Sequence, residues 1–289
     1  MNFVMYEFDE MKIYRGKDIF ITPKIMVVQP TIDQIIDFGE RKYFNAVHNL
    51  CGVGADFKWQ LWDYSNIDYT QIEDFDLFIK FISHLVSSKK RLYDKWLSNP
   101  EEYKQELANL TSQEDIDAMY FNPLALTLKK KNAEGVFEPL DLADFQGFFN
   151  NQTQQPELYD VVNDVKIDRA VYTRMVDAVR QIHYFKRNSE LPANEKTKMD
   201  LIDDARDEAM AQSRQPYKSM LKPLVSALTV KCGLCGDNKI YNMTINAFLD
   251  NIKRVGKIQD AELLLQGAYS GFSSLKGVDR TRLEWAGEI

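Results

Sequence analysis

The chain has 289 residues, of which 45% are hydrophobic and 27% are charged, and its formal net charge is -7. This composition is typical of a globular chain that is large enough for one or two hydrophobic cores. The acidic balance argues against a nucleic-acid backbone as the main partner, and three cysteines are too few for a disulfide framework in a chain of this size.

Membrane and export signals are not expected either. No uninterrupted apolar run reaches the roughly 18 residues of a membrane span. The N-terminal MNFVMYEFDEMK is acidic where a secretory signal is basic and then apolar. The sequence therefore predicts no membrane association and a cytoplasmic location. A local basic patch at Lys129, Lys130 and Lys131 stays compatible with the overall acidic charge.

The first part of the chain, residues 1–90, is predicted to form a small β-element followed by helices. Residues 12–29 are rich in β-branched and aromatic side chains, with Gly16 and Lys17 placed to form a hairpin turn. A third short strand is expected at Ile25–Val28.

Helices are expected after this element. Thr31 is placed to cap the first helix, and apolar residues then recur at helical spacing as far as Leu50. An aromatic-rich stretch follows, with a further helical stripe from Phe75 to Leu85. Aromatic residues at this density are usually buried, so we expect this stretch to lie in the core.

Residues 91–190 are predicted to form a polar insertion or second lobe. One hairpin is expected, with strands at Leu124–Leu128 and Val136–Leu140 across a lysine-rich turn, followed by a short helix. Residues 151–160, NQTQQPELYD, are interpreted as a linker. An apolar stripe then predicts a helix over residues 168–184.

Residues 191–289 are predicted to form a C-terminal helical module. One apolar face indicates a helix that Thr244 caps and Gly256 ends, and a second helix follows with its apolar face from Ala261 to Phe272. The predicted fold class is therefore α+β and mainly α-helical. It has a small N-terminal β-hairpin element followed by helices, and a C-terminal helical hairpin.

A partner-binding surface is predicted on the second of these C-terminal helices. Gly267 and Gly271 lie one turn apart with Ala268 between them, so another helix backbone can approach closely, at a cost of roughly 1 kcal/mol per glycine in helix propensity. Leu264 and Phe272 flank this strip. The alternative is that the same face completes the chain's own core.

Two residue pairs carry the spacing of a metal site. Cys232 and Cys235 have the spacing of a zinc knuckle, and His48 and Cys51 are separated by the same three-residue step. Together they would supply the four ligands of a structural zinc site. The alternative is a glycine-rich turn with two unbridged thiols. No other cofactor is expected.

No pattern in the sequence predicts catalysis. There is no phosphate-binding loop, no nucleophile elbow and no paired catalytic serine and histidine. The carboxylates from Asp200 to Glu208 lack the Glu-x-x-His pattern of a di-metal bundle and are interpreted as a solvated helix face. A DNA-binding helix-turn-helix around Gly256 is disfavoured because its second helix would present Asp260 and Glu262. A non-enzymatic protein is predicted.

Two parts of the chain carry a family resemblance. The first contains IYRGKDI, PTIDQIIDFGERKYFNAVHNLC, DFKWQLWD and DFDLFI, and the second contains FLDNIKRVGKIQDAELLLQGAYSGFSSLKGVDRTRLEWAG. This combination, over residues 12–85 and 244–285, resembles proteins encoded among the tail genes of tailed phages and prophages of Gram-positive bacteria. The resemblance implies a tail-morphogenesis protein, similar to the tail assembly chaperones that coat the tape-measure protein before the tail tube forms. Those proteins are mostly helical, are not enzymes and leave the finished particle.

The resemblance also implies the partner and the location. The expected partner is a phage tail protein such as the tape-measure protein, in the host cytoplasm, and a homo-oligomer stays open. One alternative is a structural component retained in the virion, at the neck or tail, and another is a host-directed phage protein that acts by binding. Acidic charge and a glycine strip suit reversible contact with an apolar helix, whereas a permanent component normally has larger interface patches.

Overall fold

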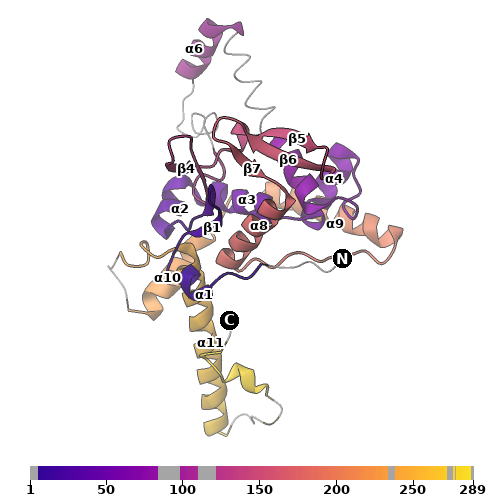
Figure 1. Ribbon diagram of the computed structural model, residues 1–289. Helices are drawn as coiled ribbons and strands as arrows, with labels where there is room; N and C mark the ends of the chain where they lie inside the picture. Colours follow the sequence, from indigo (N-terminus) through magenta and orange to yellow (C-terminus); the bar gives the residue numbers. More distant parts are fainter. Residues whose placement is uncertain are drawn as a thin grey trace.

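The computed structural model describes residues 6–83, 98–109, 122–233, 238–271, 276 and 278–287. The predicted α+β class is confirmed, because helices dominate and the strands form two small antiparallel sheets (Figure 1). The α-helices are α1 (Glu10–Tyr14), α2 (Ile32–Phe38), α3 (Glu40–Cys51), α4 (Lys58–Ser65), residues 74–83, α6 (Pro100–Asn109), α8 (Arg169–His183), α9 (Glu195–Ser213), α10 (Leu221–Lys231) and α11 (Ile245–Tyr269). Short 3-10 turns are η1 (Gly54–Phe57), η2 (Leu142–Asp144) and η3 (Arg280–Arg282). Within these described ranges, no helix combines the length and the apolar character needed to cross a membrane.

The strands are arranged in two separate sheets. They are β1 (Ile19–Thr22), β2 (Ile25–Val27), β3 (Leu128–Lys131), β4 (Phe137–Pro139), β5 (Gln146–Asn150), β6 (Gln155–Asp160) and β7 (Val165–Ile167). The first sheet has the order β1-β2-β3-β4, so β2 pairs with a strand that lies far away in the sequence. The second sheet has the order β5-β6-β7, and its register places Phe148 opposite Glu157 and Gly147 opposite Leu158.

Helix α8 lies at the centre of the core. Its apolar residues recur on one face, as in an amphipathic helix that packs on a protein interior. The fully buried side chains on this face are those of Met175, Ala178, Val179 and Ile182. The helix packs against α3, β1, β2, β7 and α11. Asp168 caps its start by accepting a hydrogen bond from the N–H of Val171 at 2.9 Å, so the predicted helix over residues 168–184 is confirmed.

The N-terminal hairpin turns at a different place from the predicted one. Gly16 ends α1 with a φ of 67°, a left-handed conformation that suits glycine. The chain reverses instead at Pro23 and Lys24, between β1 and β2, where the Thr22 hydroxyl accepts from the N–H of Lys24 at 3.2 Å. The predicted turn at Gly16 and Lys17 is therefore wrong, and the strand expected third is β2, the second strand of the hairpin.

The start of α2 follows the predicted signal. The Thr31 hydroxyl accepts a hydrogen bond from the N–H of Gln34 at 3.2 Å, and the Gln34 side chain accepts one from the N–H of Thr31 at 2.9 Å. This capping box gives partners to N–H groups that have none inside the helix. The apolar stripe continues into α3, where Tyr43, Val47 and Leu50 are buried.

Most of the aromatic-rich stretch lies in the interior, as predicted. Phe57, Phe75 and Phe78 are buried, whereas Tyr64 is 76% exposed. Phe57 belongs to a second, smaller hydrophobic cluster that also contains Ile202 of α9. Helix α9 packs against α4 beside this cluster.

Strands from residues 91–190 join the N-terminal strands. A hairpin exists in this segment as β3 and β4, and its second strand lies where it was expected. The strand predicted at Leu124–Leu128 is wrong, because residues 123–127 form turns and the lysines expected in the hairpin turn, Lys129 to Lys131, belong to β3. The short helix expected after the hairpin is the 3-10 turn η2. The linker interpretation of residues 151–160 is wrong, because β6 forms the middle strand of the second sheet there. The three-part division of the chain stays a prediction, and residues from all three parts meet in one hydrophobic cluster.

The lysine run on β3 is not a uniform basic patch. Lys130 is 1% exposed, and its Nζ donates to Asp144 Oδ2 at 2.7 Å and to a carboxylate oxygen of the equally buried Asp160. Burial lowers the pKa of Lys130, but its bonds to the two carboxylates more than offset this, so the net shift of that pKa is upward. Lys130 thereby links β3 of the first sheet to β6 of the second.

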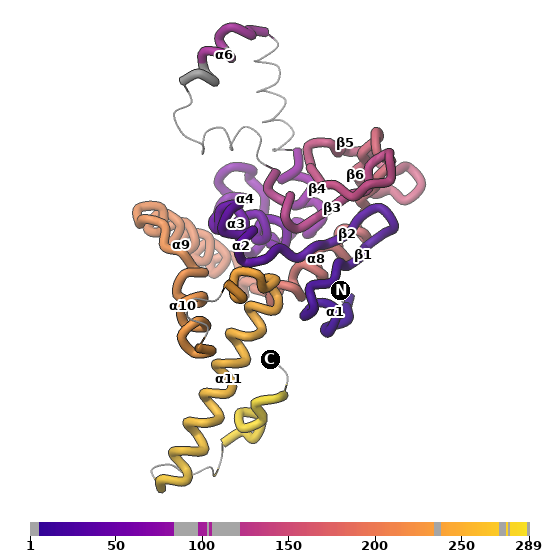
Figure 2. Tube along the Cα trace, turned by 90° about the vertical axis from the view of Figure 1, so that its left-hand side faces the viewer, coloured from indigo at the N-terminus to yellow at the C-terminus, as the bar shows by residue number. Residues whose placement is uncertain are grey.

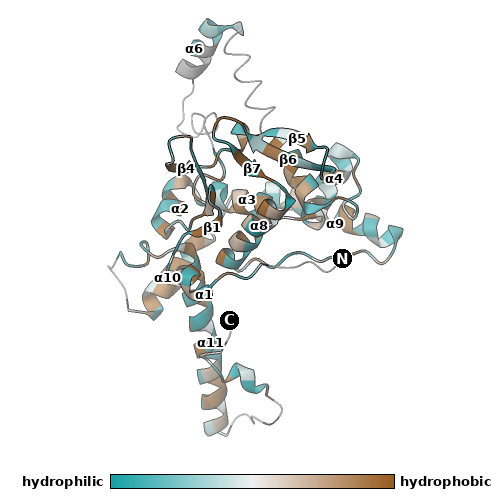
Figure 3. Cartoon of the chain, in the orientation of Figure 1, coloured by the Kyte–Doolittle hydropathy of each residue, from teal (hydrophilic) through white to brown (hydrophobic). Residues whose placement is uncertain are grey.

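The C-terminal module contains one long helix, and the predicted helical hairpin is wrong. Helix α11 runs unbroken through Gly256, where a Cβ would meet no atom within 4 Å. Its first turns reach the core, and the rest projects from the body in both views (Figures 1 and 2). Hydrophobic residues continue into this projecting part (Figure 3).

Candidate partner-binding site

Helix α11 is fixed to the body by its first two turns. Ile245 and Phe248 are fully buried, and the N–H of Ile245 donates to the carbonyl of Pro30 at 3.0 Å. The buried Asn246 side chain donates to the carbonyl of Ile182, near the end of α8, at 2.9 Å. The direction in which α11 leaves the body is therefore set by contacts with the core.

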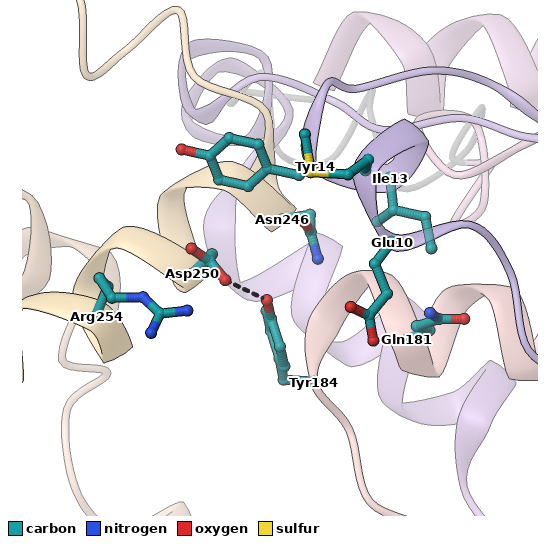
Figure 4. Close-up of a pocket in the computed structure, with 9 residues that line it drawn as sticks. Glu10, Ile13, Tyr14, Gln181, Tyr184, Asn246, Asp250 and Arg254 are labelled. Carbon is teal, nitrogen blue, oxygen red and sulfur yellow. Dashed lines mark hydrogen bonds between the residues drawn. The ribbon is translucent and has the colours of Figure 1, made fainter. Parts of the chain in front are cut away.

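A cavity of about 410 Å³ with both polar and apolar walls lies where α11 leaves the body (Figure 4). It is lined by residues of α1, of the end of α8 and of α11: Glu10, Met11, Ile13, Tyr14, Gln181, Tyr184, Asn246, Asp250 and Arg254. The Tyr184 hydroxyl donates to Asp250 Oδ1 at 2.7 Å. Burial and this neighbouring carboxylate raise the pKa of Tyr184, so its hydroxyl stays protonated at neutral pH. The lining residues can hold a polar group, but they do not pair a nucleophile with a general base.

The C-terminal segment runs back along the projecting half of α11. Arg282 forms a two-pronged ion pair with Asp260, with distances of 2.7 and 3.0 Å. Arg254 donates to the carbonyl of Trp285 at 2.6 Å. Ala261 is only 3% exposed, so one face of the projecting half is covered. These contacts are mostly polar and lie near the surface, so they hold the C-terminal segment only weakly against α11.

The predicted glycine strip is only partly formed. Leu264, Gly267 and Ala268 lie on α11 and are half-buried. Gly271 lies past the end of the helix with a φ of 78°, so it ends the helix and does not share a helix face with Gly267. Phe272 lies outside the described residues. The strip as a flat surface on one helix is therefore wrong, and the use of this region by a partner stays a prediction.

The most exposed apolar side chains of the projecting half were missed by the sequence analysis. Leu263 is 68% exposed and Tyr269 is 88% exposed. The sequence does contain a signal that an apolar side chain is exposed here, namely the run Leu263, Leu264 and Leu265. Three consecutive helical residues are spread over about 200° of the helix circumference, so they cannot all face one neighbour.

A second cavity, of about 560 Å³, lies between α2 and α10. Its apolar walls include Ile36, Val225 and Tyr241. The Glu40 carboxylate lies at the same cavity and accepts hydrogen bonds from the backbone N–H groups of Met220 and Leu221, at 2.6 and 2.8 Å. A residue of α3 thus caps α10 and gives the groove a polar end, which no local sequence pattern indicated.

The predicted zinc ligands lie on different elements. His48 and Cys51 are at the end of α3, Cys232 directly follows α10, and Cys235 lies outside the described residues. Cys51 is buried, and this burial raises the pKa of its thiol to about 12, whereas His48 and Cys232 are exposed. Among the residues with a described position, no three His, Cys, Asp or Glu side chains gather as a ligand set. The zinc site stays a prediction.

Two other sequence features have structural roles. The unbroken α11 lacks the turn that a helix-turn-helix requires. On the acidic face of α9, Arg206 pairs with Asp203 of the same helix and with Asp63 of α4, at 2.5 and 2.7 Å. Part of that face therefore holds α9 against α4.

Known proteins do not supply a family for this chain. No protein-family model, no curated protein and no solved structure matches it.

Proposed function

We propose that the protein is a non-catalytic phage tail assembly protein, a chaperone that binds an apolar helical segment of the tape-measure protein in the host cytoplasm. The resemblance of residues 12–85 and 244–285 to proteins encoded among phage tail genes supports this role. The second of these parts contains α11, whose projecting half carries the exposed Leu263, Leu265 and Tyr269.

The observation that carries the proposal is the exposed apolar surface on the projecting half of α11. Leu265 and Tyr269 lie one turn apart on the same side of the helix, and they are 36% and 88% exposed. Neighbouring exposed apolar side chains on a projecting helix are typical of a surface that binds another protein. A partner helix can cover them by lying along α11, with apolar anchors at helical spacing.

The buried first turns of α11 support the same role. Because Ile245 and Phe248 are held in the core, the projecting half is presented in a fixed direction. Binding then costs less conformational entropy than it would for a helix on a flexible linker. Arg254 already holds a backbone carbonyl of the protein's own C-terminal segment, so this surface is suited to holding another stretch of chain.

Co-expression with the tape-measure protein of the same phage tests the proposal. The double variant Leu265→Asp, Tyr269→Asp should keep the wild-type circular dichroism spectrum and should leave the tape-measure protein insoluble. The matched control is Val161→Asp, Val162→Asp, because these residues are 55% and 81% exposed near the turn between β6 and β7. The proposal is wrong if the α11 variant solubilises the tape-measure protein as well as the control does.

Mass spectrometry of purified phage particles separates the chaperone from the alternatives. A chaperone should be absent from finished particles. Its presence in a fixed ratio to the tail proteins would establish a structural component of the neck or tail. A host protein recovered with it in place of a tail protein would favour the host-directed alternative.

A further inference from the structure

The second sheet ends in an exposed edge strand. In the order β5-β6-β7, β5 has no strand on its outer side among the residues that the structure describes. Residues Gln146 to Phe149 are all exposed, with Phe148 at 46% and Phe149 at 59%. The backbone of β5 is therefore accessible along the upper edge of the body (Figure 1).

Strand β5 lacks the features that usually protect such an edge. Its sequence, QGFFN, contains no charged residue and no proline, and its pairing with β6 is regular along its whole length. Natural edge strands normally carry lysine, proline or a bulge, because an unprotected row of N–H and C=O groups accepts a further strand. β5 is thus a template for one more antiparallel strand.

The charge around β5 permits a second copy of this chain to supply that strand. With a net charge of -7, two copies repel each other over most of their surfaces. Opposite Phe148, the Glu157 carboxylate is already paired with Lys166 at 2.7 Å, and it accepts from Asn150 at 2.8 Å. Two copies can therefore meet along the uncharged β5 without opposing an unpaired Glu157 carboxylate to its counterpart.

The strand is also complementary to itself. When two β5 strands pair antiparallel over their full length, Phe148 lies opposite Phe148 of the second copy, and Gly147 lies opposite Phe149. The space beside Gly147 is open, because a Cβ there would meet nothing within 4 Å, so the incoming Phe149 can lie over it. Aromatic cross-strand pairs and aromatic cover over an edge glycine both stabilise sheets.

We propose that two copies of the protein associate through antiparallel pairing of their β5 strands, which joins the two three-stranded sheets into one continuous sheet. The interface is small. A phenylalanine buries roughly 150–250 Å² at most, and about half of Phe148 and Phe149 is already covered. The two copies together therefore stay below the roughly 1,000 Å² of a stable interface, and the dimer is reversible and concentration-dependent.

Sedimentation velocity of the purified full chain, without any tail protein, tests the dimer. The wild type should shift with rising concentration toward twice the 33.6 kDa of one chain. Phe149→Lys should raise the dissociation constant of the dimer by more than about tenfold, because each of the two copies loses its interfacial Phe149 side chain. Val162→Lys adds the same charge at an exposed turn of the same sheet and should dimerise like the wild type. A wild type that stays monomeric, or a Phe149→Lys variant that still dimerises normally, overturns the proposal.

A disulfide cross-link tests the register and does not depend on the lysine variants. In a Cys232→Ser, Cys235→Ser background, Phe148→Cys places two thiols directly opposite each other, within the Cα separation that a disulfide allows. It should form a covalent dimer on mild oxidation. Asn150→Cys places the two Cα atoms about 14 Å apart in this register and should not. Equal cross-linking of the two variants, or none with Phe148→Cys, overturns the proposed pairing. Because no partner protein is present, the result is independent of the tail assembly proposal.

Discussion

Replacing His183 with glutamine should make the protein less sensitive to acid. His183 is buried in α8, where Nδ1 lies 2.7 Å from the carbonyl oxygen of Val179 and Nε2 lies 2.7 Å from the Tyr43 hydroxyl. A carbonyl oxygen only accepts, so Nδ1 carries the proton and Nε2 accepts from the tyrosine, which leaves the ring neutral. Burial lowers the pKa of His183 from 6.5 to about 4.

This lowered pKa determines how the free energy of unfolding changes with pH. Between pH 6.5 and pH 4, the unfolded chain binds a proton at this histidine that the folded protein does not bind. The free energy of unfolding therefore falls as the pH falls through this window, and the stabilisation is fully present above it. A difference of about 2.5 pKa units corresponds to about 3 kcal/mol.

Urea unfolding between pH 7 and pH 4.5 measures this contribution. His183→Gln should be less stable than the wild type at pH 7, because it loses part of the buried hydrogen bonding, and the gap should narrow by about 2.5 kcal/mol at pH 4.5. His48→Gln, which changes an exposed histidine of α3, is the matched control. Parallel curves for His183→Gln and the wild type would refute the reasoning.

Two single contacts and the predicted zinc site give three further predictions. Lys130→Met should lower the free energy of unfolding in urea by roughly 3–5 kcal/mol, because Asp160 then stays buried without its cation. The control Lys129→Met, on the same strand, should lower it by less than about 1 kcal/mol. Equal losses for the two variants would contradict the buried ion pair. Glu40→Ala should cost about 1–2 kcal/mol through the lost cap of α10, and Glu40→Gln, which keeps an acceptor oxygen, should cost less. Elemental analysis of protein purified without chelator should find less than about one tenth of a zinc per chain, and one ion per chain would establish the predicted site.

Helix starts could be predicted from the sequence because they depend on adjacent residues. Thr31 and Asp168 each place an acceptor just before an apolar stripe, and both cap helices. Strand β6 could not be predicted in the same way. One of its inward-facing residues is Asp160, whose buried carboxylate pairs with Lys130 of the other sheet and accepts hydrogen bonds from Val162 and Asn163. A charged residue at a buried position hides the alternation that identifies a strand.

The predicted partner-binding strip was wrong because the roles of two glycines, Gly256 and Gly271, were interchanged. A glycine inside a helix costs roughly 1 kcal/mol, which a long helix can absorb, and it ends a helix only where the backbone turns left-handed. The backbone does so at Gly271 and not at Gly256, the reverse of the predicted roles. The projection of α11 depends on contacts such as that between Ile245 and Pro30, which lie far apart in the sequence, so no local pattern could reveal it.

Strand β5 and the projecting half of α11 lie at opposite ends of the body in both views (Figures 1 and 2). A dimer through β5 would therefore carry two α11 surfaces, both remote from the interface. When one long partner contacts both, the second contact becomes intramolecular, which raises the overall affinity without any new contact. If the proposed function is right, two such surfaces around Leu265 and Tyr269 should bind one long tape-measure protein more tightly than a single surface does. Phe149→Lys, which leaves α11 intact, should accordingly reduce the amount of soluble tape-measure protein on co-expression, while Val162→Lys should not. A Phe149→Lys variant that is monomeric yet fully active would show that each copy acts alone.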